Sequence, residues 1–156
     1  QNIGAGKWDR VEQTTRIAIG INFAMTGALI ALVTLFDRPI LALFLEGGGN
    51  AIEIGQHMMH IVNWSYMLFG VAMVMFGTMR ANGVVLPPLV ILTVSLFGVR
   101  IGFYFLSYST LGVDGLWLSF PVSTSVSVVL AFLYYRFGRW REKTLQIHRP
   151  TLRPSS

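Results

Sequence analysis

The sequence predicts an all-α membrane protein with four transmembrane helices. Of its 156 residues, 53% are hydrophobic and only 12% are charged, against a charged fraction of about 25% in typical soluble domains. Four apolar runs, each with one charge or none, divide the chain. Soluble buried helices of this length normally keep a polar stripe, which these runs lack. We therefore expect each run to cross the bilayer.

The predicted spans cover residues 17–36, 61–79, 88–106 and 116–135. At a rise of about 1.5 Å per residue, a helix of roughly twenty residues reaches the thickness of the hydrocarbon core, about 30 Å. Residues 1–16 are expected to form a cytoplasmic loop, and residues 136–156 a basic cytoplasmic tail.

The segments between the spans predict turns and one interfacial stretch. Residues 40–45 are apolar but too short to span, so we expect them to lie at the membrane interface. Residues 51–60 are expected to extend the second helix beyond the bilayer. Pro87 and Pro88 indicate a helix start, where the missing N–H groups cost nothing. Residues 107–115 are expected to form the last short loop.

Basic residues indicate the orientation. Apart from Arg38 and Arg100, every Lys and Arg precedes the first span, follows the last, or lies between the second and third. The positive-inside rule places these segments in the cytoplasm, so we expect a multi-pass protein of the cell (inner or plasma) membrane with both termini cytoplasmic. The net charge of +5 then reflects topology, and no nucleic-acid partner is expected. Four tryptophans near span ends are typical of an aromatic belt: Trp8, Trp64, Trp117 and Trp140.

No residue pattern predicts an enzyme. Gly4-Ala5-Gly6-Lys7 is not a phosphate-binding loop, because that loop needs an earlier glycine and a Ser or Thr after the lysine, where this chain has Trp8. The chain has no cysteine, and no Ser/His/Asp set or paired carboxylates stand out. We therefore expect no catalytic residues and no cofactor.

A histidine pair is the nearest approach to a metal site. His57 and His60 share one face of a helix at metal-compatible spacing. Two imidazoles without a third ligand make a weak site, so we expect interfacial histidines and no metal site.

Arg100 is the strongest candidate for a functional residue in the spans. Its insertion near mid-bilayer costs about 2.5–3.5 kcal/mol, so it should face a partner, a carbonyl or a wet cavity. No Asp or Glu lies in any predicted span, so a counter-ion would come from a loop residue such as Asp114. The alternative is that Arg100 snorkels to the outer headgroups. Asn63 and Met67 share a face of the second span and could line a cavity, although plain packing is the commoner duty of such residues.

Small and hydroxylated residues predict contacts between helices. Two small-residue sets let backbones approach closely, and we interpret them as intramolecular packing: Gly20, Ala24 and Ala28, and Gly98 with Gly102. Five hydroxylated residues cluster around Pro121: Ser119, Ser123, Thr124, Ser125 and Ser127. We expect them to satisfy the carbonyls that a helix proline frees, with a solute contact as the second choice.

Several blocks together resemble one family. They are QNIGAGKWDRV, FDRPILALF, FGTMRANGVVLPPLV, VRIGFYFL, LGVDGLWLSFPVS and YYRFGRWRE. In order and spacing they look like the multidrug and toxic compound extrusion (MATE) transporters, up to about Lys143. Members of that family have twelve helices in two six-helix lobes around a central cavity. They exchange sodium or protons for cationic or amphipathic drugs.

The resemblance implies that this chain is a fragment of the C-terminal lobe. Its four spans correspond to helices nine to twelve, and its opening residues to the loop between helices eight and nine. Implied partners are the N-terminal lobe, helices seven and eight, the lipid bilayer and an organic cation or amphipathic drug. The complete transporter would use sodium or a proton as coupling ion. Some branches bind that ion through an aspartate on the tenth helix; here the nearest polar residue toward the middle is Ser65, with Asn63 closer to the outer end.

The predicted function is that of a secondary antiporter exporting drugs or other organic solutes, with this fragment inactive alone because alternating access needs two lobes. One alternative is a lipid-linked saccharide flippase of the same superfamily, although such cavities tend to need several cations and this chain offers Arg100. The other alternative is a small four-helix membrane subunit that binds a partner.

Overall fold

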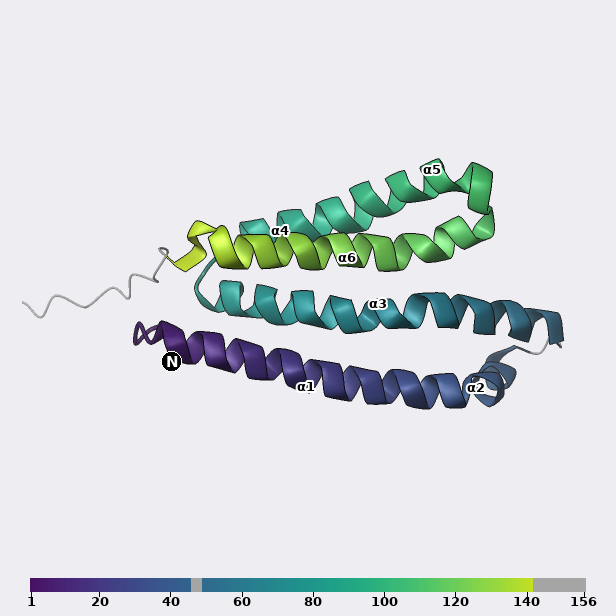
Figure 1. Cartoon of the computed structure of the whole chain (residues 1–156), viewed down its shortest axis with the longest axis horizontal. Coiled ribbons are helices and arrows are strands. Elements are labelled where there is room, and N and C mark those ends of the chain that lie inside the picture. Colours follow the sequence, from purple (N-terminus) through teal and green to yellow (C-terminus); the bar gives the residue numbers. More distant parts are fainter. Residues whose placement is uncertain (46–48, 142–156) are drawn as a thin grey trace, which may run out of the picture.

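Four long helices, each running opposite to the one before it in the chain, make up the structure, a computed structural model that describes residues 1–45 and 49–141. They are α1 (Trp8–Leu35), α3 (Gly49–Ala81), the continuous stretch of α4 (Leu86–Thr93), η1 (Val94–Val99) and α5 (Arg100–Leu111), and α6 (Val113–Phe137) (Figure 1). Each is long and apolar enough to cross a membrane, and every described element is a helix. The predicted fold class is confirmed. The tail beyond residue 141 lies outside the described residues.

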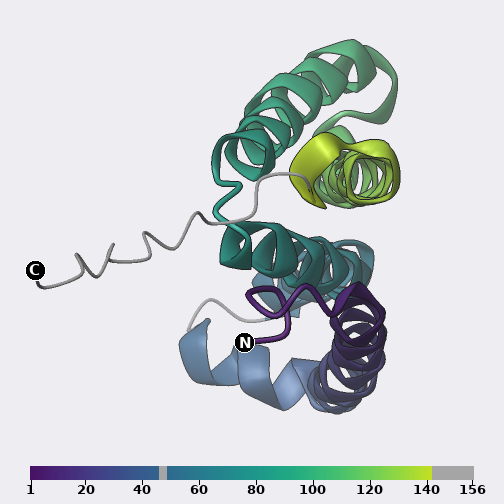
Figure 2. The same ribbon diagram turned by 90° about the vertical axis from the view of Figure 1, so that its left-hand side faces the viewer.

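The long helices lie side by side in the order α1, α3, α6, α5, so that α3 and α6 form the middle of the row (Figure 2). Two short helices sit at opposite ends of it: α2 (Asp37–Phe44) beside the start of α3, and η2 (Arg139–Arg141) after α6. We call the end with α2 the hairpin end and the end with η2 the terminal end.

Several boundaries differ from the prediction. Helix α1 begins at Trp8, so the second half of the predicted loop 1–16 is helical. The predicted loop 107–115 shrinks to Gly112, because its φ of 54° lets the chain reverse in one residue. Residues 51–60 do extend the second long helix, as predicted, and Pro87 and Pro88 lie in the first turn of α4.

The hydrophobic core lies at the terminal end, around Phe76 and Met79 of α3. Trp140 covers the end of this core, and only 1% of the residue is exposed. Its ring packs edge to face on Trp8, with the ring centres 5.7 Å apart. Asn82 Nδ2 donates a hydrogen bond of 2.6 Å to the carbonyl of Trp140. The prediction of Trp140 as part of an interfacial belt is therefore wrong, because η2 folds its ring back beneath Trp8.

A stripe of small residues forms the buried face of α6. Its members recur every four residues: Gly115, Ser119, Ser123, Ser127 and Ala131. Spacing of four places them on one side of the helix, where they let α3 and α5 approach. Contrary to the prediction from the sequence, the hydroxyl groups do not bind, among the described residues, the carbonyl that Pro121 leaves without a donor. Pro121 frees the carbonyl of Trp117, whereas the hydroxyls of this cluster that donate do so to the carbonyls of Leu116, Phe120 and Pro121.

The predicted packing of the other glycines is also wrong within the described chain. A Cβ added at Gly20, Gly98 or Gly102 would meet no atom of another helix within 4 Å among the described residues. The close approach of α1 and α3 occurs instead at Gly70, where an added Cβ would come within 2.1 Å of Asn22 Oδ1.

Candidate functional site

The candidate site is a hollow of about 220 Å³ between α3, α6 and the η1–α5 stretch. Its lining combines two predicted site residues, Ser65 and Arg100, with aromatic and apolar walls and two more hydroxyls. The remaining lining residues are Tyr66, Phe69, Leu96, Phe120 and Thr124.

Arg100 is held by two contacts with α6. Its Nε donates a hydrogen bond of 3.2 Å to Ser123 Oγ, and its Cζ lies 4.1 Å from the centre of the Phe120 ring. The Ser123 hydroxyl donates its own proton to the Phe120 carbonyl at 3.0 Å, so its oxygen is free to accept. Cation–π contacts of this kind contribute about 0.5–2 kcal/mol, the more so when water is excluded.

The suggested counter-ion Asp114 is wrong for Arg100. Asp114 is engaged by His57, with Nε2 and Oδ1 3.0 Å apart. Snorkelling of Arg100 to the headgroups stays a prediction; its hydrogen-bond partner Ser123 lies at about the same depth as Arg100 itself. The two residues are about equally far from the turn at Gly112, some 17 Å along their helices at 1.5 Å per residue.

A π-helical segment sets the direction of Arg100. Six residues, Val94–Val99, form η1 inside an otherwise α-helical stretch, and Arg100 follows immediately. Such segments are rare and often lie at functional sites. Ser95, on this segment, is fully buried, and its hydroxyl has no hydrogen-bond partner among the described residues.

Asn63 and Met67 lie on the opposite side of α3, facing α1. Asn63 lines a second hollow of about 250 Å³ with Tyr66 and four residues of α1. Met67 packs at Gly27, 3.5 Å from where a Cβ would stand. The structure thus pairs Ser65 with Arg100 and separates both from Asn63, because two residues along a helix amount to a turn of about 200°.

The hairpin end carries two histidine–carboxylate pairs. His60 Nε2 lies 3.1 Å from Asp37 Oδ2, and Gln56 Nε2 donates to the other oxygen at 2.7 Å. The Gln56 hydrogen bond, helped by the Arg38 backbone N–H and by His60, lowers the pKa of Asp37 below its ordinary value of 3.8 against the opposing effect of burial. His57 pairs with α6 instead, so the two histidines bind different helices. Within 1–45 and 49–141, no three potential metal ligands gather.

Sequence reasoning missed Asn22 and Phe120. Asn22 Nδ2 donates to the Met67 carbonyl at 3.3 Å, across the α1–α3 contact. As an amide within an apolar run it could have been noticed from the sequence alone. Phe120 could not, because one more aromatic residue in an apolar helix is indistinguishable from packing until Arg100 is seen above its ring.

These features define a multi-pass helical membrane protein with an arginine-lined hollow between its helices. Comparison with known proteins then gives the family. The MatE family model matches residues 1–106, and the chain belongs to this family.

The relatives of this chain carry multidrug resistance names. It is 37% identical, over 93% of its own length, to the probable multidrug resistance protein YoeA of Bacillus subtilis strain 168. It is 30% identical over 93% of its length to YpnP of the same organism, and 24% identical over 81% to NorM of Thermotoga maritima. Both YpnP and NorM are also named as probable multidrug resistance proteins. No solved structure matches the chain.

The chain spans about a third of its relatives: 31% of YoeA, 32% of YpnP and 27% of NorM. The activity of a complete transporter is therefore a proposal for this chain.

Proposed function

We propose that this chain is the helix nine to twelve part of a secondary transporter that exports drugs or other organic solutes in exchange for sodium ions or protons. The observation that carries the proposal is its membership of the MatE family, together with relatives named as probable multidrug resistance proteins. Four antiparallel helices of spanning length agree with that role. By itself the chain would export nothing, because alternating access rocks two lobes around a shared site.

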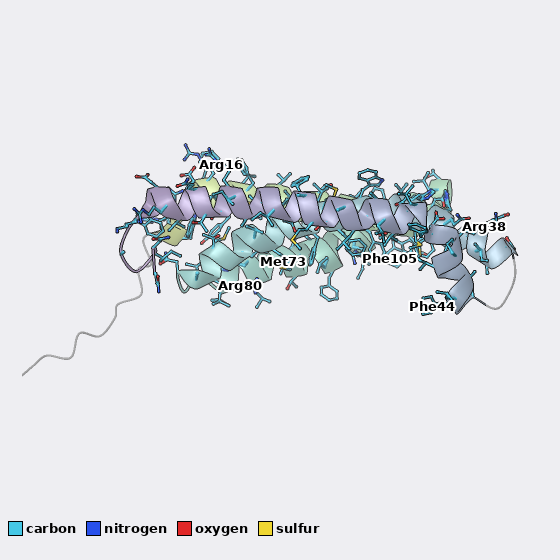
Figure 3. All side chains as sticks on the ribbon, turned by 90° about the horizontal axis from the view of Figure 1, so that it is seen from below. Arg16, Arg38, Phe44, Met73, Arg80 and Phe105 are labelled. Atoms are coloured by element: carbon cyan, nitrogen blue, oxygen red, sulfur yellow. The ribbon has the colours of Figure 1, made fainter. Side chains whose placement is uncertain are left out.

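The proposed orientation places the terminal end in the cytoplasm and the hairpin end outside, in the cell (inner or plasma) membrane. Arg16 and Arg80 lie toward the terminal end, and Arg38 lies at the hairpin end with Phe44 (Figure 3). The other described basic residues outside the spans also belong to the terminal end: Lys7, Arg10, Arg136, Arg139 and Arg141. Cytoplasmic enrichment of Lys and Arg supports this orientation.

The substrate path is proposed to include the Arg100 hollow, with Ser65 on its α3 wall. The Asn63–Met67 face is the second candidate, since the Asn63 Nδ2 is buried without a partner among the described residues. Buried polar groups normally find partners, and a solute in the second hollow would supply one.

Transport in vesicles tests the proposal. The complete protein is reconstituted into liposomes, and movement of ethidium is followed while a sodium or a proton gradient is imposed and then collapsed with monensin or nigericin. We expect ethidium movement that stops when one of the two gradients is removed. Movement that is indifferent to both gradients, or none at all, contradicts the proposal.

A further inference from the structure

Arg100 brings an uncompensated charge into the helix row. Its two contacts, the Ser123 hydroxyl and the Phe120 ring, are both neutral. The predicted spans 17–36, 61–79, 88–106 and 116–135 contain no Asp or Glu, and among the described residues no carboxylate forms an ion pair with Arg100. A charge in this environment is normally paired or exposed to water.

The guanidinium keeps unused donors. Nε is engaged by Ser123, while the described residues offer no hydrogen bond to either terminal nitrogen. The Phe120 ring lies 4.1 Å from Cζ, and an acceptor must approach within the guanidinium plane, where the terminal N–H groups point. Arg presents these groups as a fork that fits the two oxygens of a carboxylate or phosphate.

Among the described residues, no wall hydroxyl accepts a hydrogen bond from the terminal nitrogens of Arg100. Ser65 Oγ gives its proton to the Val62 carbonyl at 2.6 Å, and Thr124 Oγ1 gives its proton to the Phe120 carbonyl at 2.8 Å. Tyr66 adds a phenolic O–H at the edge. The hollow is therefore electropositive at Arg100 and apolar at Phe69 and Leu96.

We propose that the Arg100 hollow binds an oxyanion, a carboxylate or phosphate, carried by an amphipathic substrate. At about 220 Å³ it is smaller than the roughly 300–1,000 Å³ of pockets that enclose a drug-sized molecule. It accepts the anionic group and the ring or chain beside it, while the rest of the substrate lies elsewhere in the transporter. This inference rests on the proposed function and adds zwitterionic or anionic amphiphiles to the substrates of the transporter.

Two dyes that differ in one group test the inference. Rhodamine 110 carries a free carboxylate, and rhodamine 123 is its methyl ester on the same ring system. Binding of each dye to the complete purified protein in maltoside detergent is measured by fluorescence anisotropy. Arg100→Gln is expected to weaken binding of rhodamine 110 by about tenfold or more, the usual loss for a charge-assisted hydrogen bond, and that of rhodamine 123 by less than about threefold.

The controls separate charge from folding. Arg100→Lys keeps the charge without the fork, and we expect an intermediate loss for rhodamine 110. Arg16→Gln removes one positive charge from a side chain that is 82% exposed, and should leave both dyes unaffected. Retained binding of rhodamine 123 shows that the Arg100 variants are folded. Equal losses for the two dyes, or none for rhodamine 110, overturn the inference.

A third measurement identifies the source of the oxyanion. If a phospholipid supplies it, added phosphatidylglycerol competes with rhodamine 110 in the unchanged protein and not in Arg100→Gln; if the substrate supplies it, the lipid has no such effect. Either result, competition by the lipid or its absence, supports the inference only if binding of rhodamine 110 depends on Arg100. Ethidium transport that persists while the two rhodamines behave alike contradicts this inference and leaves the proposed function standing. Absence of all dye transport and binding contradicts both.

Discussion

Asn22 of α1 lies against Gly70 of α3, in the space that a side chain at position 70 would occupy. A Cβ there would stand 2.1 Å from Asn22 Oδ1 and 2.5 Å from its Nδ2. From this position Asn22 donates to the Met67 carbonyl at 3.3 Å. The missing side chain at Gly70 thus leaves room for the Asn22 amide, and the Asn22 hydrogen bond joins α1 to α3 in the middle of the row.

Gly70→Ala is expected to turn Asn22 away and break its hydrogen bond to Met67. Such bonds in membrane proteins contribute about 0.6–1.5 kcal/mol. Gly77→Ala is the matched control, because an added Cβ at Gly77 meets nothing within 4 Å. The thermal stability of the two variants in detergent should differ by about 1 kcal/mol, with Gly70→Ala the weaker.

A double-mutant comparison makes the cause specific. With Asn22→Ala in the background, the two alanine substitutions should become equivalent, because the side chain that Gly70 accommodates is gone. If their difference persists, the Asn22–Gly70 contact is not what limits the packing of α1 on α3.

Asp37 should make the stability of the hairpin end pH-dependent. Its folded pKa is lowered, chiefly by the Gln56 hydrogen bond, so its contribution is present above the ordinary pKa of 3.8 and lost as pH falls through the lower folded value. Thermal unfolding between about pH 6 and pH 3 should show a loss of stability below about pH 4 that Asp37→Asn lacks. Gln56→Leu should reduce the same loss. Parallel pH profiles for all three proteins would contradict this assignment.

Trp140 should be the most costly tryptophan to remove. It is buried against Trp8 and Tyr135, with ring centres 5.7 and 5.0 Å away, so Trp140→Ala should destabilise by about 3–5 kcal/mol. Trp64→Ala serves as control because Trp64 is 64% exposed, and it should cost far less. Detergent unfolding followed by tryptophan fluorescence compares the two; similar losses would mean that η2 does not close the core.

The proposed orientation can be tested with single cysteines, since the chain has none of its own. In the complete protein, freed of any cysteine elsewhere, Arg38→Cys should react with a membrane-impermeant maleimide on intact cells. Arg80→Cys, at the opposite end of the row (Figure 3), should react after the cells are permeabilised. The reverse pattern would invert the proposed topology.

Helix number and order could be predicted from the sequence because a spanning helix is defined by length and apolarity alone. The faces through which neighbouring helices contact one another could not be predicted. The stripe from Gly115 to Ala131 was hidden because its serines also suit a proline-bearing helix, and Gly98 and Gly102 carry the expected spacing without touching a neighbouring helix in the described chain. Rotation of each helix about its axis depends on its neighbours.

The candidate site was predictable as residues but not as an arrangement. A lone arginine in a span stands out because its insertion is unfavourable, so Arg100 was found. Ser65 lines the same hollow as Arg100, whereas Asn63 faces α1. This difference depends on the angle at which α3 meets α6, and no local sequence pattern encodes that angle. The His57–Asp114 and His60–Asp37 pairs likewise join segments far apart in the chain.

The π-helical segment at Val94–Val99 acts as a one-residue insertion in an otherwise regular helix. If these six residues took up α-helical geometry with none removed, everything from Arg100 onward would swing through about 100°. The guanidinium would leave Phe120 and aim at a different neighbour, although every side chain of α5 would keep its identity. A change between π-helical and α-helical geometry in this short segment is therefore able to redirect the cation without substituting it.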